Sequence, residues 1–314
     1  MKSHKDKIVV IGAGNVGEAI AYTLMVRVLA NDIVLVDLNE DRAKGAALDI
    51  AHGTSFFNQV WVRSGGYEEC ADAQMIIIAA GVARKPGQTR LELAQVNVSI
   101  VQSITENIMK YAKNPLILVV SNPADITTLA VQKASGLSPE RVIGSGTSLD
   151  TARFRYLLSK KLQVNIEDIN AYVIGEHGDS RVPIYSSANI GGFPLKDFAR
   201  QVGAEINEQE LAERTKNGGA EIIGLKGATF YGIAMAVSSI VQTIMKDNSA
   251  IIPVAHVLDE SFGPWAGVAI SLPCRIGWEG INQTLRIPMD YYEKSMMDAS
   301  VNTLKEFAKE LDLL

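Results

Sequence analysis

Three closely spaced glycines near the start of the chain constrain its fold more than any other feature. Gly12, Gly14 and Gly17 have the spacing Gly-x-Gly-x-x-Gly and directly follow the β-branched run Lys7–Ile11. Apolar residues then recur at helical spacing through Glu18–Ala30, so the glycines lie in a turn between a strand and a helix. The sequence therefore predicts a strand–turn–helix unit at the start of the chain.

The three glycines have separate roles in such a turn. Gly12 permits the tight bend, Gly14 lets the backbone approach a phosphate, and Gly17 lets the helix pack closely on the strand. The helix N-terminus at Asn15 and Val16 offers amide donors and a dipole that favour an anion. The turn indicates a bound dinucleotide with its phosphates at this helix end, and a glycine turn without a ligand is the alternative.

A carboxylate completes the pattern. Asp37 ends the next β-branched run, Ile33–Val36, twenty residues after Gly17. In this position a carboxylate accepts hydrogen bonds from the adenosine ribose hydroxyls and repels a 2′-phosphate. Leu38 and Asn39 follow and supply no compensating cation. We therefore expect NAD as the cofactor rather than NADP.

The first half of the chain alternates short apolar runs with helical patterns. Met75–Ala79 and Leu116–Val120 have the length of strands, and one apolar face extends between them from Leu93 to Ile108 until Asn114-Pro115 ends the helix. Continuous apolar strands separated by helices are typical of a parallel sheet covered on both faces. We expect an α/β fold with a doubly wound parallel sheet of the Rossmann type.

The second half has a different pattern. Helical stretches alternate there with closely spaced strand candidates that have Gly and Pro nearby, which predicts a mixed α+β substrate domain with antiparallel hairpins. The expected helices are Thr151–Lys161, Asn207–Asn217, Thr229–Met245 and Tyr291–Leu311, and the expected strands are Asn170–Ile174, Val254–Leu258, Gly267–Leu272 and Gln283–Ile287. A chain of 314 residues has room for two domains. We place the division near Ser145, with residues 1–145 binding NAD and residues 146–314 binding the substrate.

Composition and charge exclude several classes of protein. Apolar residues make up 47% of the chain and charged residues 21%, which indicates a globular protein rather than a disordered one. The apolar runs are too short for a membrane span, and the N-terminal run continues into the glycine turn without a leader cleavage site. The net charge of −5 gives no sign of a basic surface for nucleic acid. We expect a cytoplasmic protein without membrane or nucleic-acid partners.

The two cysteines, Cys70 and Cys274, are too few for a disulfide framework or a four-cysteine zinc site. We expect both to be free thiols, wholly or partly buried, and we expect no metal.

Four polar segments interrupt otherwise apolar surroundings. They are Gly-Val-Ala-Arg-Lys-Pro-Gly-Gln-Thr-Arg at 81–90, Ser-Asn-Pro at 121–123, Thr-Ser-Leu-Asp-Thr-Ala-Arg-Phe-Arg at 147–155 and Gly-Glu-His-Gly-Asp at 175–179. The first two follow buried strands, where open α/β sheets bind their ligands. Through these segments and the glycine turn, the sequence resembles the L-lactate/malate dehydrogenase family over essentially its whole length.

That resemblance implies an acid–base and carboxylate-binding site. His177 would exchange a proton with the substrate oxygen, and Asp150 would orient its ring and stabilise the imidazolium. Arg153 lies three residues after Asp150, on the same helical face, and would bind the substrate carboxylate through a bidentate fork. No Ser or Cys nucleophile pattern accompanies Asp150 and His177, which argues against hydrolysis.

The resemblance also assigns residues around the carbonyl and the cofactor. Arg90 would come from a mobile loop and polarise the substrate carbonyl once the loop closes. Asn122 would form hydrogen bonds near that carbonyl and the nicotinamide, and Ser145 would be a further cofactor contact. The implied substrate is a small 2-oxo or 2-hydroxy acid.

Three positions disagree about the substrate. Arg84 stands where lactate-type members usually have glutamine and malate-type members have arginine, and it would pair with the second carboxylate of oxaloacetate. Thr229 and Glu176, in contrast, match lactate-type members, and Thr229 would narrow the pocket. We expect the conversion of pyruvate and NADH to L-lactate and NAD, with reduction of oxaloacetate as the alternative.

The resemblance further implies a homotetramer and a regulatory site. Related bacterial enzymes are activated by fructose 1,6-bisphosphate through an arginine and a histidine. Arg155 matches the arginine, but Asn170 stands in place of the histidine. We therefore expect weak or absent activation by this sugar bisphosphate.

Two other functional classes share a related cofactor domain. NAD-dependent glycosidases need a metal site with Cys and His, and neither cysteine of this chain lies in the matching motifs. A non-catalytic protein on a dehydrogenase fold would not need His177, Asp150, Arg153 and Arg90 together.

Overall fold

The fold is known from a computed structural model that describes residues 6–56, 60–83 and 87–314. Its main feature is a nine-stranded sheet with the order β12-β11-β10-β6-β5-β4-β1-β2-β3. The strands from β3 to β6 in this order pair in parallel, which is the arrangement of a doubly wound sheet. They are β1 (Lys7–Ile11), β2 (Asp32–Val36), β3 (Trp61–Ser64), β4 (Met75–Ile78), β5 (Ile117–Val119) and β6 (Val142–Gly144).

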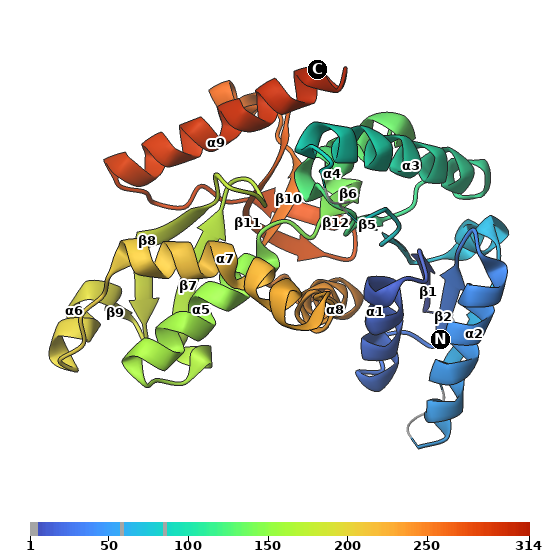
Figure 1. Cartoon of the computed structure of the whole chain (residues 1–314), viewed down its shortest axis with the longest axis horizontal. Coiled ribbons are helices and arrows are strands. Elements are labelled where there is room, and N and C mark those ends of the chain that lie inside the picture. The colour runs from blue at the N-terminus through green and yellow to red at the C-terminus, as the bar shows by residue number, and fades with distance from the viewer. Residues whose placement is uncertain (1–5, 57–59, 84–86) are drawn as a thin grey trace.

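The continuous apolar strands bury both faces of this sheet. Side chains alternate along a strand, so Ile8 and Val10 belong to one core cluster while Val9 and Ile11 belong to the other. The first cluster packs under α1 (Asn15–Val26), α2 (Glu40–Gly53) and α8 (Tyr231–Lys246). The second packs under α3 (Arg90–Tyr111), α4 (Ala124–Ser135) and α9 (Tyr291–Glu310), which Figure 1 shows together above the sheet. The predicted Rossmann architecture is confirmed.

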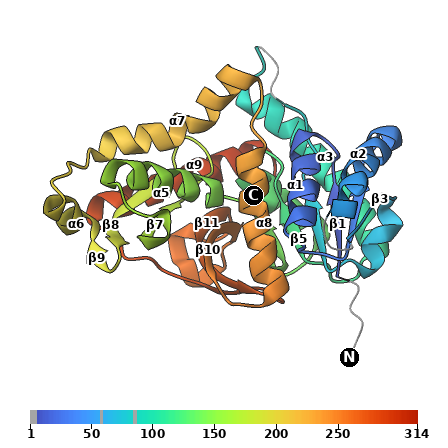
Figure 2. The same cartoon turned by 90° about the horizontal axis from the view of Figure 1, so that it is seen from below.

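The middle of the chain forms a smaller antiparallel sheet with the order β7-β8-β9. Figure 2 shows it at the opposite end of the molecule from β3. Its strands are β7 (Ile169–Ile174), β8 (Val182–Ile190) and β9 (Phe193–Pro194), and its helices are α5 (Ser148–Leu162), α6 (Leu195–Gln201) and α7 (Glu208–Lys226). Its core is built around Phe154, whose ring meets Tyr185 edge-on at a centroid distance of 5.1 Å. Within the described ranges, five short 3-10 helices connect the elements: Thr54–Phe56, Tyr67–Asp72, Pro139–Arg141, Ile166–Asp168 and Glu260–Trp265.

The last three strands extend the parallel sheet instead of forming a separate lobe. β10 (Ile251–Val257), β11 (Ala269–Gly277) and β12 (Gly280–Thr284) are antiparallel, and Ala255 of β10 pairs with Gly144 of β6. We expected a strand at Gln283–Ile287, but β12 ends at Thr284, so the predicted bounds were wrong. The strand begins earlier because Gly280 closes the hairpin with a φ of +106°, in the left-handed region. Sheet pairing therefore crosses the division near Ser145, which stays a prediction.

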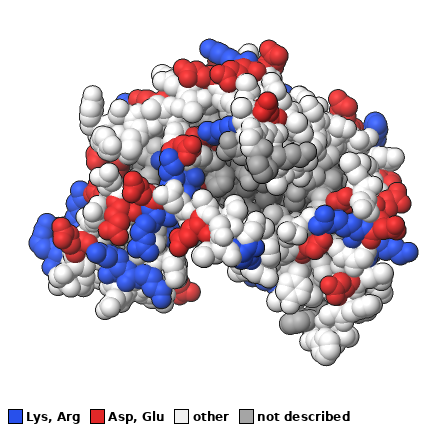
Figure 3. Space-filling model, in the orientation of Figure 1, with Lys and Arg blue, Asp and Glu red and all other residues white. Residues whose placement is uncertain are grey.

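The surface and the cysteines agree with the composition. Figure 3 shows basic and acidic side chains beside one another at the left, top and right of the face seen in Figure 1. Cys70 and Cys274 are both free and buried, as expected, and burial raises the pKa of each thiol to about 12. No helix in the described ranges is long and apolar enough to cross a bilayer.

Candidate active site

The glycine turn leaves an open surface at the start of α1. A Cβ on Gly12 would lie 2.6 Å from the Ala80 nitrogen, and one on Gly17 would lie 1.8 Å from the Gly12 oxygen, so both positions are closed to a side chain. Above Gly14, in contrast, the nearest atom to such a Cβ is a guanidinium nitrogen of Arg42 at 4.0 Å. No side chain caps α1 at Gly14, which leaves the first-turn amides for a ligand. The turn fits the pyrophosphate of NAD.

Asp37 lies beside this turn and is fixed by two backbone amides. Its Oδ2 accepts from the Ala13 nitrogen at 2.7 Å and its Oδ1 from the Asn39 nitrogen at 2.9 Å. An ionised carboxylate has about four acceptor sites, so two remain for ribose hydroxyls. Leu38 is 97% exposed and adds no charge. The carboxylate therefore fits NAD, as the sequence predicted.

The polar segments that follow the parallel strands meet at one edge of the sheet. Asn122 follows β5, and its carbonyl accepts a hydrogen bond from Asn97 Nδ2 at 2.7 Å. Asn97 also forms two hydrogen bonds with the backbone of Val82, which follows β4. Its Oδ1 accepts from the Val82 nitrogen at 2.8 Å, and its Nδ2 donates to the Val82 carbonyl at 3.2 Å. The side chain of Asn122 stays exposed, while Ser145, directly after β6, is buried. Asn97 thus connects two of the segments that sequence alone had singled out.

His177 and Asp150 form the centre of the site. His177 lies in the turn after β7, and its Nδ1 is 2.5 Å from Oδ2 of Asp150 in the first turn of α5. Burial favours the neutral ring, but the Asp150 carboxylate outweighs it and raises the pKa of His177. Burial also opposes ionisation of Asp150, yet His177 and two arginines hold the pKa of this carboxyl at about 2. The pair keeps Nδ1 occupied and leaves Nε2 as the nitrogen that can react.

Two arginines share the other oxygen of Asp150. Arg153 Nη1 lies 3.0 Å from Oδ1, and Arg181 Nη1 lies 2.5 Å from the same atom. Within the described ranges, Nε and Nη2 of Arg153 have no hydrogen-bond partner, so this edge of the guanidinium can receive a carboxylate. Sequence reasoning missed Arg181. The signal was its charge, placed four residues after His177 and directly before the buried strand β8.

A second buried carboxyl group, Asp125 in α4, was also missed. Its Oδ2 accepts from the backbone nitrogen of His177 at 2.6 Å, while its Oδ1 has no partner among the described residues. Burial raises the pKa of Asp125 to about 7, although His177 opposes this change. Asp125 is the one charged residue in the buried stretch from Ala124 to Val131, which was the available signal. Asp125 fixes the backbone of His177, while Asp150 holds its ring.

Arg90, the first residue of α3, is bound to the residue that precedes His177. Its guanidinium forms an ion pair with the buried carboxylate of Glu176 and lies 5.1 Å from the centroid of the Phe307 ring. Glu176 also accepts from the backbone nitrogen and the hydroxyl of Ser180, at 3.1 and 2.6 Å. The Glu176 carboxylate is thus compensated by Arg90 and by Ser180.

The remaining predicted residues lie elsewhere or outside the described ranges. Arg84 belongs to residues 84–86, which the structure does not describe. Thr229 is half-buried between α7 and α8. Arg155 donates through Nε to the Ala171 carbonyl at 2.9 Å, and Asn170 donates to Asn189 Oδ1 at 3.2 Å.

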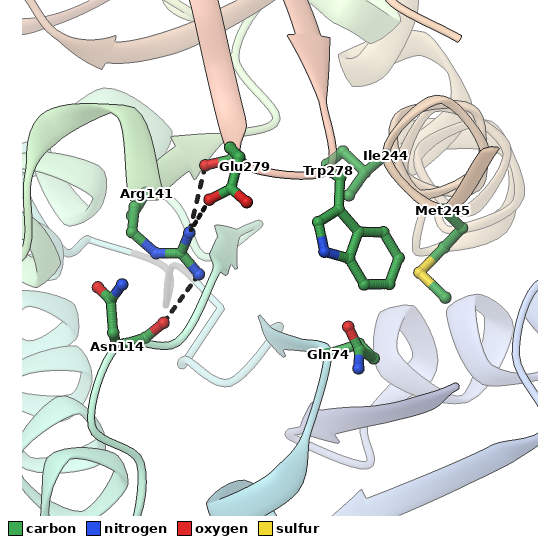
Figure 4. Close-up of a pocket in the computed structure, with 7 residues that line it drawn as sticks. All are labelled: Gln74, Asn114, Arg141, Ile244, Met245, Trp278 and Glu279. Carbon is green, nitrogen blue, oxygen red and sulfur yellow. Dashed lines mark hydrogen bonds and ion pairs between the residues drawn. The ribbon is translucent and has the colours of Figure 1, made fainter. Parts of the chain in front are cut away.

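Another pocket lies at the opposite edge of the sheet, before β4, β5 and β6. Figure 4 shows it between Arg141, Trp278 and Gln74. Arg141 donates to the carbonyls of Asn114 at 2.8 Å and Glu279 at 3.3 Å, and it pairs with the Glu279 carboxylate at 3.6 Å. Its guanidinium is already satisfied, so this pocket is a weaker candidate for an anionic ligand.

Both halves of the chain match models of known protein families. The family model for the NAD-binding domain of lactate/malate dehydrogenases matches residues 6–144, and the model for their α/β C-terminal domain matches residues 147–312. The chain is 42% identical to an L-lactate dehydrogenase of Acetivibrio thermocellus, with 98% of each chain covered. It is 43% identical to one of Halalkalibacterium halodurans, with 96% of each covered.

Solved structures give the same result. A lactate dehydrogenase from a Medee basin deep-sea metagenome library superimposes with a TM-score of 0.94 at 34% identity, over 98% of this chain and 99% of that one. The ligand-bound minor L-lactate dehydrogenase of Enterococcus mundtii superimposes with a TM-score of 0.93 at 36% identity, over 98% of each chain.

Proposed function

This chain belongs to the lactate/malate dehydrogenase family, and from that premise we propose that it is an NAD-dependent L-lactate dehydrogenase. The observation that carries the proposal is the contact of His177 and Arg153 with the same buried carboxylate, Asp150. An acid–base group and a carboxylate-binding group are thereby held side by side. That is the arrangement required to reduce a 2-oxo acid to a 2-hydroxy acid.

The proton moves through His177. In the imidazolium form, Nε2 donates a proton to the pyruvate carbonyl oxygen, and the neutral ring takes a proton from the lactate hydroxyl in reverse. Asp150 favours the charged ring before transfer and keeps Nδ1 protonated afterwards. A cofactor bound at the glycine turn would supply the hydride to pyruvate as NADH, or accept it from lactate as NAD, and so balance this proton.

The other residues position the substrate. The free edge of Arg153 pairs with the substrate carboxylate, and Arg90, once released from Glu176, donates to the carbonyl oxygen. Asn122 adds a hydrogen bond at the same edge of the sheet, and Thr229 lines the pocket. The cofactor pyrophosphate would bind the amides of Asn15 and Val16 in the turn formed by Gly12, Gly14 and Gly17. Asp37 would bind the adenosine ribose. Asn122 and Ser145 would make further contacts with the cofactor.

Arg84 favours a second substrate, oxaloacetate. An arginine that faces a second carboxylate in a closed site gains charge-assisted hydrogen bonds of about 1.5–3 kcal/mol each. We therefore expect the wild type to reduce both pyruvate and oxaloacetate with NADH. Replacing Arg84 by glutamine should lower kcat/KM for oxaloacetate by about 10-fold to 100-fold and leave kcat/KM for pyruvate unchanged or higher.

The measurement is NADH oxidation with each substrate at several concentrations. If pyruvate is reduced rapidly and oxaloacetate no faster than the background, the role of Arg84 is wrong and the proposed enzyme stands. If neither acid is reduced, the proposed function itself is wrong.

We also propose a cytoplasmic homotetramer with little or no response to fructose 1,6-bisphosphate. Arg155 donates to the Ala171 carbonyl and stacks on the Tyr172 ring at 5.2 Å, and Asn170 carries no charge. A phosphate bound here would find only the Arg155 guanidinium of this pair as a cation, and Arg155 already contacts Ala171 and Tyr172. The KM for pyruvate should change less than about twofold when millimolar activator is added, and a large drop would contradict the proposal.

A further inference from the structure

We propose that Arg181 is a positioning residue that holds Asp150, keeps one edge of Arg153 free for the substrate, and weakens the attraction of Asp150 for the His177 proton. The proposal rests on the function proposed above, in which His177 exchanges a proton with the substrate.

Two hydrogen bonds fix the Arg181 guanidinium. Nη1 lies 2.5 Å from Asp150 Oδ1, and Nε donates to the Gly178 carbonyl at 2.7 Å. The side chain is only 11% exposed, so the planar fork is held in one orientation. Gly178 directly follows His177 in the chain. Arg181 therefore joins the turn that carries His177 to helix α5, which carries Asp150.

The contacts of Asp150 explain why a second arginine is useful. Asp150 is fully buried, and its carboxylate needs compensating partners. His177 occupies Oδ2, while Arg153 and Arg181 share Oδ1, and the Arg181 distance is the shorter by 0.5 Å (3.0 Å against 2.5 Å). Without Arg181, the compensation of Oδ1 would fall to Arg153 alone. Arg153 would then turn its fork toward Asp150 and lose hydrogen bonds to the substrate carboxylate.

The charges that face His177 come from four elements. Asp150 and Arg153 lie on α5, Asp125 on α4, Arg90 on α3, and Glu176, Asp179 and Arg181 in the turn itself. Glu176 and Arg90 form an ion pair with each other. Asp179 pairs with Lys216 of α7 at 3.0 Å. Asp150 raises the pKa of His177 and Arg181 lowers it. Removal of Arg181 leaves the attraction of Asp150 for the imidazolium less opposed.

The two directions of the reaction need opposite forms of His177. Pyruvate reduction needs protonated His177, so its kcat/KM falls as pH rises through the His177 pKa. Lactate oxidation needs the neutral ring, so its kcat/KM falls as pH decreases through that pKa. In Arg181→Gln both midpoints should move to higher pH by about one unit, and the pyruvate KM should rise about tenfold.

Arg181→Lys separates the two parts of the proposal. Lysine keeps the positive charge but cannot contact Asp150 and Gly178 with one planar fork. Its pH midpoints should return close to those of the wild type, while its pyruvate KM stays raised. The matched control is Arg200→Gln on α6, which removes the same charge from a side chain that is 77% exposed. The control should match the wild type in both readouts.

The experiment is a set of pH profiles of kcat/KM in both directions, with NADH binding measured by fluorescence as a test of folding. Shifted midpoints in Arg181→Gln that Arg181→Lys reverses support the proposal. Lower rates with unmoved midpoints in a variant that binds NADH overturn it and leave the proposed enzyme standing. A wild type that does not reduce pyruvate overturns the proposed function, and this inference with it.

Discussion

Replacing His177 by asparagine is expected to lower kcat for pyruvate reduction by about three orders of magnitude. Asparagine can keep a hydrogen bond to Asp150, but its amide has no proton to exchange near neutral pH. Arg153 and Arg181 remain on Asp150, so the buried carboxylate stays compensated and the variant should fold. The measurement is kcat at saturating NADH and pyruvate.

Two controls separate chemistry from structure in this prediction. NADH affinity should be unchanged, since the glycine turn and Asp37 lie on other elements. His52→Asn, an exposed position at the end of α2, should have the activity of the wild type. A His177→Asn enzyme with a kcat within about tenfold of the wild type would contradict a role of this ring in proton transfer.

Replacing Arg153 by glutamine should lower kcat/KM for pyruvate by about 10³-fold, mainly through KM. The free edge of Arg153 can donate two charge-assisted hydrogen bonds to one carboxylate, each of about 1.5–3 kcal/mol. Arg153→Lys should recover only part of the loss, because an ammonium cannot form the bidentate pair. Arg214→Gln on α7, an exposed arginine paired with Glu210, is the matched control and should change nothing.

Pyruvamide has a neutral amide in place of the pyruvate carboxylate. Comparing the two substrates therefore tests directly whether Arg153 binds the carboxylate. The wild type should prefer pyruvate over pyruvamide by a large factor, and Arg153→Gln should lose most of that preference. If the variant discriminates between the two as strongly as the wild type, Arg153 does not bind the carboxylate.

Local patterns were sufficient to predict the fold class. The β-branched run at Lys7–Ile11, the glycines after it and Asp37 predicted the start of a doubly wound sheet, and the structure confirms that sheet. Such patterns depend on neighbours in the chain, because side-chain period and glycine turns are local properties. The place of β10 in the sheet was not predictable in this way. It depends on the pairing of Ala255 with Gly144, more than one hundred residues apart in the chain.

In the active site too, local spacing predicted some contacts and the tertiary structure alone creates others. Asp150 and Arg153 are three residues apart on one helix, so their shared face could be inferred from spacing. Arg181 and Asp125 reach His177 through contacts that only the tertiary structure creates. Nor could the sequence predict that Glu176 would hold Arg90, since the two residues lie 86 positions apart.

The exchange of a proton between His177 and the substrate is tested most directly by the wild-type pH profiles in the two directions. Because Asp150 raises the pKa of His177, kcat/KM for pyruvate should fall toward high pH with a midpoint above the ordinary value of about 6.5. Lactate oxidation should show the mirror image and fall below its midpoint. A pyruvate profile without a basic limb, or a lactate profile that falls toward high pH instead, would contradict the account.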